Sequence, residues 1–148
     1  MRHAKSDWSA GQPDHGRPLN ERRRLAAPLM AAWLAERGLV PGTVLLSDAA
    51  RTRETWARMR RLLDEVPEPV PDPGLYHAGP QAIAAGLEVA PGPGPVLLIA
   101  HEPGISAAAR LVSGGPEPAR MPTAAIAVLE GTPGAMRLAE VATPKALV

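Results

Sequence analysis

The sequence predicts an α/β fold in which a mostly parallel sheet lies between two layers of helices. Residues 44–46 and 96–100 form two short, uninterrupted apolar runs, a pattern typical of strands buried on both faces. A segment with helical spacing of apolar side chains follows each run, and strands that alternate with helices favour parallel pairing. The chain has 148 residues, which suits one domain over residues 1–148 and leaves little room for a second.

The first part of the chain predicts a loop and then a helix. Residues 5–19 are polar and rich in turn-forming residues, so they predict a loop. Asn20 is a suitable N-cap, apolar side chains then recur at helical spacing, and Gly38 is a suitable C-cap. Pro28 lies inside this predicted helix, where it should remove one hydrogen bond and kink the axis.

The middle of the chain predicts two further helices. After the strand of residues 44–46, a helix is predicted over residues 51–63, with its apolar side chains on one face. The proline-rich residues 67–74 predict a connection, and residues 80–89 predict a helix with a proline in its first turn. Residues 91–95 alternate proline and glycine and predict a rigid surface loop.

The last part of the chain contains the strongest signal of a buried strand. This strand, residues 96–100, runs directly into His101. A helix is predicted over residues 105–112, and two closing strands are predicted over residues 124–129 and 136–141. Ligands of parallel sheets bind at the carboxyl ends of the strands, so we expect the functional site at that edge.

Residues near the predicted strand and helix ends indicate metal-free phosphoryl transfer. Arg2 and His3 are adjacent, Arg51 follows the strand that ends at Ser47, and His101 ends the next buried strand. Guanidinium groups grip phosphate oxygens with two parallel hydrogen bonds, and a neutral imidazole can attack phosphorus and carry the phosphoryl group covalently. The pattern therefore combines phosphate binders with a nitrogen nucleophile.

The composition excludes several classes of protein. Because 16 Lys and Arg face 15 Asp and Glu, no general attraction to nucleic acid is expected. The sequence has no cysteine, which removes disulfides, thiolate nucleophiles and cysteine-based zinc sites. No pair of histidines has the close spacing of a metal motif, so we expect no metal and no other cofactor. No apolar run approaches the ~20 residues of a membrane span, and the polar start is unlike a secretory signal. We therefore expect a cytoplasmic protein that binds no membrane.

The order of the motifs resembles the histidine phosphatase superfamily. The chain carries Arg-His at residues 2–3, Arg-Pro-Leu at 17–19, a serine-to-threonine segment at 47–52 and a strand-His-x-Pro motif that ends at 101–103. Further segments are similar to the small SixA-type phosphohistidine phosphatases of that superfamily, namely residues 14–21, 47–56, 75–78 and 122–126. The resemblance spans nearly the whole chain in order, and it implies a three-layer, phosphoglycerate mutase-like fold.

The resemblance implies a role for each matching residue. His3 would be the nucleophile that becomes phosphorylated. Arg2 and Arg51 would hold the phosphate oxygens, and His101 would donate to them and stabilise charge in the transition state. Arg17 would add a phosphate or substrate contact, or else would pair with a nearby acidic residue.

The remaining histidines and three carboxylates are weaker candidates. His15 is expected at the surface or at the mouth of the site, and His77 is expected to be structural or at the rim. Larger relatives carry a general acid in an inserted segment that this chain lacks. Asp14, Glu54 and Glu102 could replace it, although each is also expected as a solvated or structural carboxylate.

Two features depart from the family pattern. Glu102 stands where an uncharged residue is common, and a carboxylate there could repel phosphate. The Arg2-His3 pair should end a buried strand, with the strands that end at Ser47 and His101 as its neighbours, yet one residue precedes it. We therefore expect the domain to lack the usual strand before Arg2. We expect β-forming residues added at the amino terminus to raise both the melting temperature and the activity.

The favoured function is hydrolysis of phosphohistidine on a protein, through a phosphohistidine intermediate on the enzyme. The partner would be a histidine-phosphorylated protein, because few insertions surround the expected site. One alternative is the same chemistry on a small phosphate ester. A second alternative, suggested by the missing strand and by Glu102, is a non-catalytic phosphate-binding module.

Overall fold

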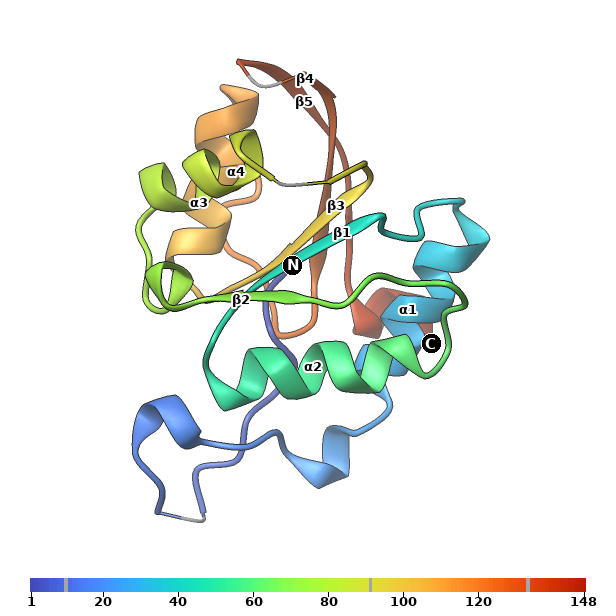
Figure 1. The fold of residues 1–148 in the computed structure, drawn as a ribbon, viewed down its shortest axis with the longest axis vertical. Coiled ribbons are helices and arrows are strands. Elements are labelled where there is room, and N and C mark those ends of the chain that lie inside the picture. The colour runs from blue at the N-terminus through green and yellow to red at the C-terminus, as the bar shows by residue number, and fades with distance from the viewer. Residues whose placement is uncertain (10, 91, 133) are drawn as a thin grey trace.

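The computed structural model describes residues 1–148 apart from residues 10, 91 and 133. Its central layer is a parallel sheet of β1 (Thr43–Ser47), β2 (Val70–Asp72) and β3 (Val96–Ile99), in the order β2-β1-β3 (Figure 1). Every residue of β1 is buried. The apolar runs around residues 44–46 and 96–99 therefore form buried strands, as their composition predicts, and these two strands pair directly with each other.

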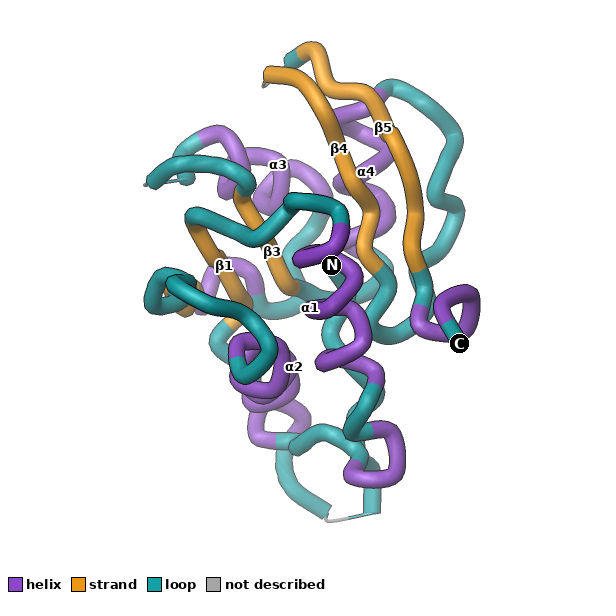
Figure 2. The backbone as a smooth tube through the Cα atoms, turned by 90° about the vertical axis from the view of Figure 1, so that its right-hand side faces the viewer, coloured by secondary structure: helices purple, strands orange, loops and turns teal. Residues whose placement is uncertain are grey.

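Helices cover both faces of this sheet. On one face lie α1 (Ala26–Glu36) and α2 (Ala50–Arg60), and on the other lie α3 (Pro80–Glu88) and α4 (Gly104–Ser113) (Figures 1 and 2). The predicted three-layer α/β fold is confirmed.

The alternation of side chains along β1 divides the core in two. Val44 and Leu46 pack in the same apolar cluster as Trp56 of α2. Leu45 belongs to a second cluster with Ile105 of α4. Because successive side chains of a strand point to opposite faces, one short apolar run fills the cores on both sides.

The first three residues continue the sheet beyond β3. Arg2 forms a parallel bridge with Ala100, and its backbone N–H donates to the oxygen of Ala125 at 3.0 Å. Ala125 lies just before β4 (Ile126–Thr132), which forms an antiparallel hairpin with β5 (Ala135–Ala142). The expectation that the strand ending at Ser47 flanks Arg2 and His3 is wrong, because β3 lies between β1 and the first residues.

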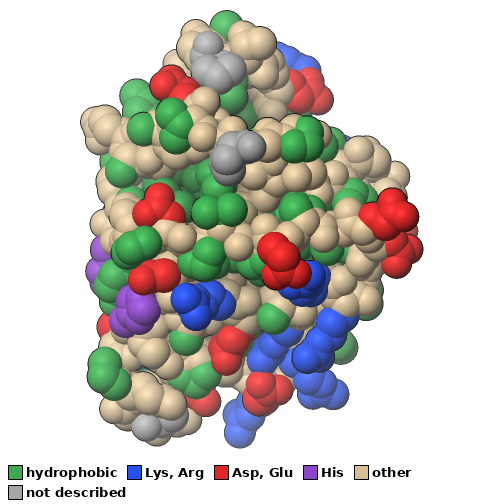
Figure 3. Space-filling model, in the orientation of Figure 1, with side chains coloured by type: hydrophobic (Ala, Val, Ile, Leu, Met, Phe, Trp, Pro, Cys, Tyr) green, Lys and Arg blue, Asp and Glu red, His purple; other side chains and the backbone are tan. Residues whose placement is uncertain are grey.

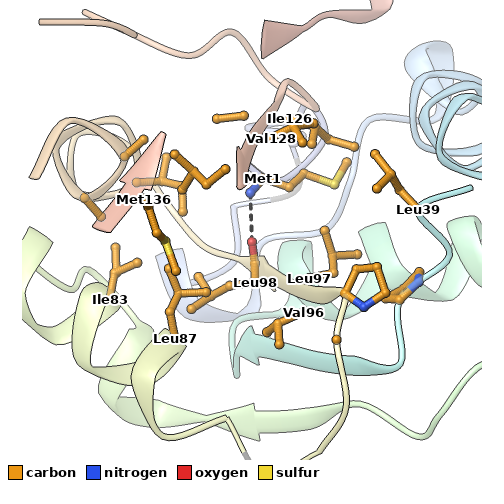
Figure 4. Close-up of a pocket in the computed structure, with 18 of the residues that line it drawn as sticks. Met1, Leu39, Ile83, Leu87, Val96, Leu97, Leu98, Ile126, Val128 and Met136 are labelled. Carbon is orange, nitrogen blue, oxygen red and sulfur yellow. Dashed lines mark hydrogen bonds between the residues drawn. The ribbon is translucent and has the colours of Figure 1, made fainter. Parts of the chain in front are cut away.

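An apolar cavity of about 380 Å³ lies beside Met1, between β3 and β4 (Figure 4). The amino group of Met1 donates to the carbonyl oxygen of Leu98 at 2.8 Å, and burial lowers the pKa of this amino group to about 5. Val96, Ile126 and Val128 are among the side chains that line the cavity. Residues added before Met1 would begin inside this cavity, and their expected effect on stability and activity stays a prediction.

The first long helix begins later than the sequence predicts. The Asn20 side chain accepts from the backbone N–H of Arg22 and so caps a single 3-10 turn, Glu21–Arg23, whereas α1 starts at Ala26. Pro28 is therefore the third residue of α1, where a backbone N–H has no partner inside the helix. The expected kink at Pro28 is wrong for this reason. Gly38 follows α1 with φ of 69°, as the predicted C-terminal signal requires.

The predicted connection of residues 67–74 contains the strand β2. Residues 70–72 pair in parallel with β1, and a 3-10 turn, Pro73–Leu75, follows. Pro71 suits β2 because β2 is an edge strand, on which a missing N–H can face solvent. Of the predicted surface loop of residues 91–95, residue 91 lies outside the described residues.

The other predicted elements are present with shifted ends. Helix α2 stops at residue 60, not 63, and both β4 and β5 are longer than expected. Among the described residues of the loop 5–19 there is one 3-10 turn, Asp14–Gly16, and a last 3-10 turn spans Pro144–Leu147. Within the described part of the chain, no helix is long and apolar enough to cross a membrane.

Candidate active site

The carboxyl edge of the sheet brings together the two histidines that the sequence places at strand ends. His3 follows the bridge between Arg2 and Ala100, and His101 follows β3. The centroids of the two rings lie 5.3 Å apart, and both residues are buried. Two segments almost one hundred residues apart in sequence thus supply one pair of imidazoles, at the edge where parallel sheets bind ligands.

The ring of His3 is held as a neutral tautomer. Its Nδ1 lies 2.7 Å from the carbonyl oxygen of Ala4, which can only accept, so Nδ1 carries the proton. Burial lowers the pKa of His3 to about 4, and the charges of Arg51, Arg2 and Arg17 act in the same direction. At neutral pH the Nε2 atom of His3 therefore keeps a free lone pair, as a nitrogen nucleophile requires.

A short hydrogen-bond chain orients His101. The N–H of Ala49 points to Ser47 Oγ at 3.3 Å, and Ser47 Oγ lies 2.7 Å from Nε2 of His101. Because Ala49 already donates to the Ser47 oxygen, the hydroxyl proton is available to His101 Nε2, which leaves the proton of His101 on Nδ1. Nδ1 is buried and makes no hydrogen bond to any described residue. Burial lowers the pKa of His101 to about 3, and Arg51 and His3 lower it further. Ser47 is a site residue whose role the sequence did not reveal.

Three arginines lie near enough to His3 for their charges to act on its ring, and Arg51 acts on His101 as well. Arg17 and Arg51 are buried, with 6% and 3% of their surface exposed, and Arg2 is partly buried. The Nε atom of each arginine is buried without a hydrogen-bond partner among the described residues. Arg2 is fixed by a 2.9 Å hydrogen bond from Nη1 to the oxygen of Met121. The arrangement gathers positive charge and buried donors near the neutral ring of His3, which suits a phosphoryl group.

Asp14 lies among these arginines. Its carboxylate accepts from Nη2 of Arg17 at 2.9 Å and from Nη2 of Arg51 at 3.2 Å, and its backbone oxygen accepts from Nη1 of Arg51 at 2.8 Å. The Tyr76 hydroxyl also donates to it, and Nε2 of His77 lies 3.1 Å away. The sequence-based alternative for Arg17, a pair with a nearby acid, is therefore confirmed as an observed contact.

Aromatic residues form the mouth of the site. The rings of Tyr76 and His77 stack with centroids 4.1 Å apart, and Tyr76 meets His15 edge-on at 4.8 Å. The side chains of His15 and His77 are 48% and 59% exposed, as the predictions of a surface or rim position require. Histidine side chains reach the surface on one side of the molecule, next to basic ones (Figure 3). Tyr76 is a further contact that the sequence did not single out.

The two other candidate carboxylates are structural. Glu102 accepts from the backbone N–H and the hydroxyl of Ser106, each at 3.0 Å, and so caps the start of α4. Glu54 accepts from the backbone N–H of Leu19 at 2.6 Å. Both carboxylates accept from donors of the protein, and the charge of Glu102 also acts on Arg2. The expected repulsion of phosphate by Glu102 stays a prediction. In the described residues, no group of three or more His, Asp or Glu side chains is placed to hold a metal ion.

Solved structures share this fold over the whole chain. The structure of the protein histidine phosphatase SixA complexed with tungstate superposes with a TM-score of 0.89 and covers 100% of this chain and 97% of the other, at 24% identity. The protein called SixA from Agrobacterium tumefaciens is 28% identical, with a TM-score of 0.83, over 97% of this chain and 95% of the other. A SixA from Nakamurella multipartitia is also 28% identical, with a TM-score of 0.77, over 97% and 93% of the two chains.

Sequence relatives from Mycobacterium align with most of the chain. An uncharacterized protein of Mycobacterium tuberculosis strain H37Rv is 33% identical over 139 residues, which cover 87% of this chain and 85% of the relative. An uncharacterized chloroplast protein of Arabidopsis thaliana is 40% identical over 65 residues, but the chain spans only 30% of its length. No family model matches the sequence.

Fold and site together define a phosphoryl-transfer enzyme of the hydrolase class. The chain belongs to the histidine phosphatase superfamily, and within it to the SixA-type proteins. The predicted family and enzyme class are thus confirmed, and the non-catalytic alternative is set aside.

Proposed function

We propose that this enzyme hydrolyses phosphohistidine on a protein through a phosphohistidine formed on His3. The observation that carries the proposal is the neutral His3 ring, with Nδ1 bound to Ala4 and Nε2 free beside three arginines and His101. The phosphorylated partner protein would be recognised at the mouth formed by Tyr76 and His77. The cytoplasm is the proposed place of action.

The reaction would proceed in two displacements. The Nε2 lone pair of His3 forms a bond to phosphorus while the N–P bond of the substrate breaks, and the substrate imidazole takes the electron pair and a proton from water. Water then attacks the phosphorus of phospho-His3, so that phosphate leaves and Nε2 recovers its lone pair. Both steps pass through a transition state with charge on the phosphoryl oxygens, which positioned donors stabilise.

The cationic side chains and His101 would stabilise the negative charge on the phosphoryl oxygens. Arg2 and Arg51 would hold phosphoryl oxygens from two sides, and Arg17 would add a contact through its buried Nε. The Nδ1–H of His101 would donate to a third oxygen, oriented by Ser47 at the opposite nitrogen. Arg2 and His101 are already oriented by Met121 and Ser47, whereas Arg17 and Arg51 are paired with Asp14 before the substrate binds.

The type of leaving group favours a phosphohistidine substrate. Asp14, Glu54 and Glu102 each accept hydrogen bonds from donors of the protein, so these oxygens are already engaged and are poorly placed to serve as a general acid. An imidazole leaving group is easier to expel than an alkoxide and depends less on a general acid. A protein phosphohistidine therefore suits these residues better than an alkyl phosphate ester.

A comparison of substrates tests the proposal. We expect a protein or peptide phosphorylated on histidine to be turned over with a kcat/KM at least about tenfold higher than sugar or nucleoside phosphates, since the weak acid catalysis penalises alkoxide leaving groups. Release of phosphate is measured for both classes with the same preparation. Preferential turnover of a small phosphate ester would support the alternative substrate class instead.

The pH dependence follows from the environment of His3. Its pKa is lowered to about 4, so the neutral nucleophile predominates above that pH and is lost as the pH falls through it. We expect the ring signals of His3 in an NMR titration to keep their neutral positions down to about pH 5, and kcat/KM to fall only below that range. A His3→Ala sample assigns the signals. Titration near the ordinary pKa of about 6.5 would contradict the neutral tautomer described above.

Chelators should leave the activity unchanged. The proposed charge stabilisation comes from Arg2, Arg51 and His101, which leaves no step for a divalent cation to perform. Turnover is measured before and after dialysis against EDTA, with added magnesium and zinc as separate controls. Loss of activity that one of these ions restores would show that a metal takes part.

A further inference from the structure

We propose that Asp14 is a built-in competing anion, which occupies Arg17 and Arg51 in the free enzyme and weakens the binding of inorganic phosphate. The inference rests on the proposed function to the extent that Arg17 and Arg51 are its phosphate binders. It concerns the release of the product, whereas the roles proposed above concern the chemical step.

The contacts of Asp14 are those of an anion bound in an arginine cluster. Each carboxylate oxygen takes one guanidinium, Arg17 on Oδ1 and Arg51 on Oδ2. Oδ2 also receives the Tyr76 hydroxyl and faces Nε2 of His77 at 3.1 Å. A phosphoryl group binds through the same kinds of donors, so carboxylate and phosphate use the same side chains.

Asp14 is the acidic partner of both buried arginines. The side chains of Arg17 and Arg51 are 8% and 3% exposed, and within the described residues neither has another carboxylate within 4.0 Å. Buried cations attract anions strongly, because the interior screens charge less than water does. Without the Asp14 carboxylate, both positive charges would be available to attract phosphate, and the affinity for phosphate would rise.

Asp14 remains charged under every condition in which the enzyme would work. The Tyr76 hydroxyl holds the pKa of this carboxyl well below its usual range, and the hydrogen bonds and charges of Arg17 and Arg51 lower it further. A phosphate that binds to Arg17 and Arg51 must therefore displace a carboxylate or lie beside it. Either event costs affinity, and the cost applies to the product as well as to the substrate.

For catalysis, the consequence is a balance between the affinity of the site for phosphate and the rate at which the product phosphate is released. The competing carboxylate weakens the binding of the product phosphate, while the arginines stay in the site for the transferred phosphoryl group. The backbone oxygen of Asp14 also binds Nη1 of Arg51, so that residue stays oriented when only the carboxylate is changed.

Binding of inorganic phosphate to the whole chain tests the proposal. Asp14→Asn keeps the shape and an oxygen acceptor but removes the charge, and we expect it to tighten the dissociation constant for phosphate about tenfold, the scale of one like charge a few ångströms away. Titration calorimetry measures the constant, and product inhibition by phosphate should strengthen by the same factor.

Asp48→Asn is the matched control. Asp48 contacts His15 at 2.9 Å, so it lies at the mouth, and it pairs with neither arginine. We expect the control to change the dissociation constant for phosphate less than threefold. Equal gains in both variants would mean a general field effect and would overturn the specific role of Asp14.

The other outcomes also decide the question. Phosphate affinity that is unchanged or weaker in Asp14→Asn would overturn the proposal and make Asp14 a positioning residue for the arginines. If neither the wild type nor the variant binds phosphate, the proposed function fails first, and the inference falls with it. Should Asp14→Asn not fold, Asp14→Ala also removes the carboxylate from Arg17 and Arg51 and should tighten phosphate binding in the same direction. No gain in that folded variant would count against the proposal.

Discussion

Replacement of His3 by alanine is expected to abolish turnover, with a loss of at least about a thousandfold, and to leave the fold intact. The described structure places no other free imidazole lone pair among the three arginines, since Nε2 of His101 accepts from Ser47 and Nδ1 of His101 carries the proton. The His3 side chain makes one hydrogen bond, to its own neighbour Ala4, so its removal disturbs little of the core. Rates of phosphate release and the melting temperature give the two readouts.

Trapping of the intermediate distinguishes a nucleophile from a binding residue. Wild-type enzyme that is quenched in alkali during turnover should carry labelled phosphate on His3, and the His3→Ala variant should carry none. His15→Ala is the matched control, because His15 lies at the mouth and contacts Asp48 rather than the arginines. Near-normal turnover in His3→Ala, or label that persists in it, would remove His3 from the proposed role.

Arg51→Ala and His101→Ala are each expected to reduce kcat by roughly a hundredfold or more, the usual scale for one lost transition-state donor. Arg51 is 3% exposed at the start of α2, and His101 is fixed by Ser47, so both donors are held in place before the substrate binds. Arg51→Lys should recover little of the loss, because an ammonium group cannot make the two parallel hydrogen bonds of a guanidinium. Steady-state kinetics on a phosphohistidine peptide measure all three variants.

The control for Arg51 lies on the same helix. Arg58 pairs with the exposed Glu21, away from the histidines, so Arg58→Ala should retain nearly full activity. A rise in KM with unchanged kcat in Arg51→Ala or His101→Ala would mark those residues as binding the ground state and transition state equally. That result would leave the fold assignment untouched and would refute their proposed part in the chemical step.

Local sequence patterns predicted most of the fold. The runs that became β1 and β3 are fully apolar because helices cover both faces, and such runs are visible in any sequence. β2 was missed because it is a short edge strand with proline at residue 71, and its pairing with β1 depends on a neighbour distant in sequence. The start of α1 was misjudged because Asn20 caps a separate 3-10 turn, which uses the same signal as a helix.

The site residues, like the fold, were predicted only in part from the sequence. Arg2, His3, Arg51 and His101 were all singled out from their residue types and their places near element ends, and the structure brings them to one edge. Their proposed roles remain to be tested by the variants above. The sequence suggested a possible pair for Arg17 but not the double contact of Asp14 with Arg17 and Arg51, nor the part of Tyr76 in it.

The sequence by itself determined the order of the helices and of the strands other than β2, and the reactive groups at their ends, because apolar runs, caps and side-chain chemistry are local properties. Only the tertiary structure decided that Asp14 meets Arg51 and Tyr76, which are 37 and 62 residues away along the chain. It also decided that Glu102 turns toward Ser106 and that Met1 pairs with β3. These contacts depend on how helices, loops and sheet edges pack against one another, and packing between distant segments leaves no periodic trace in the sequence.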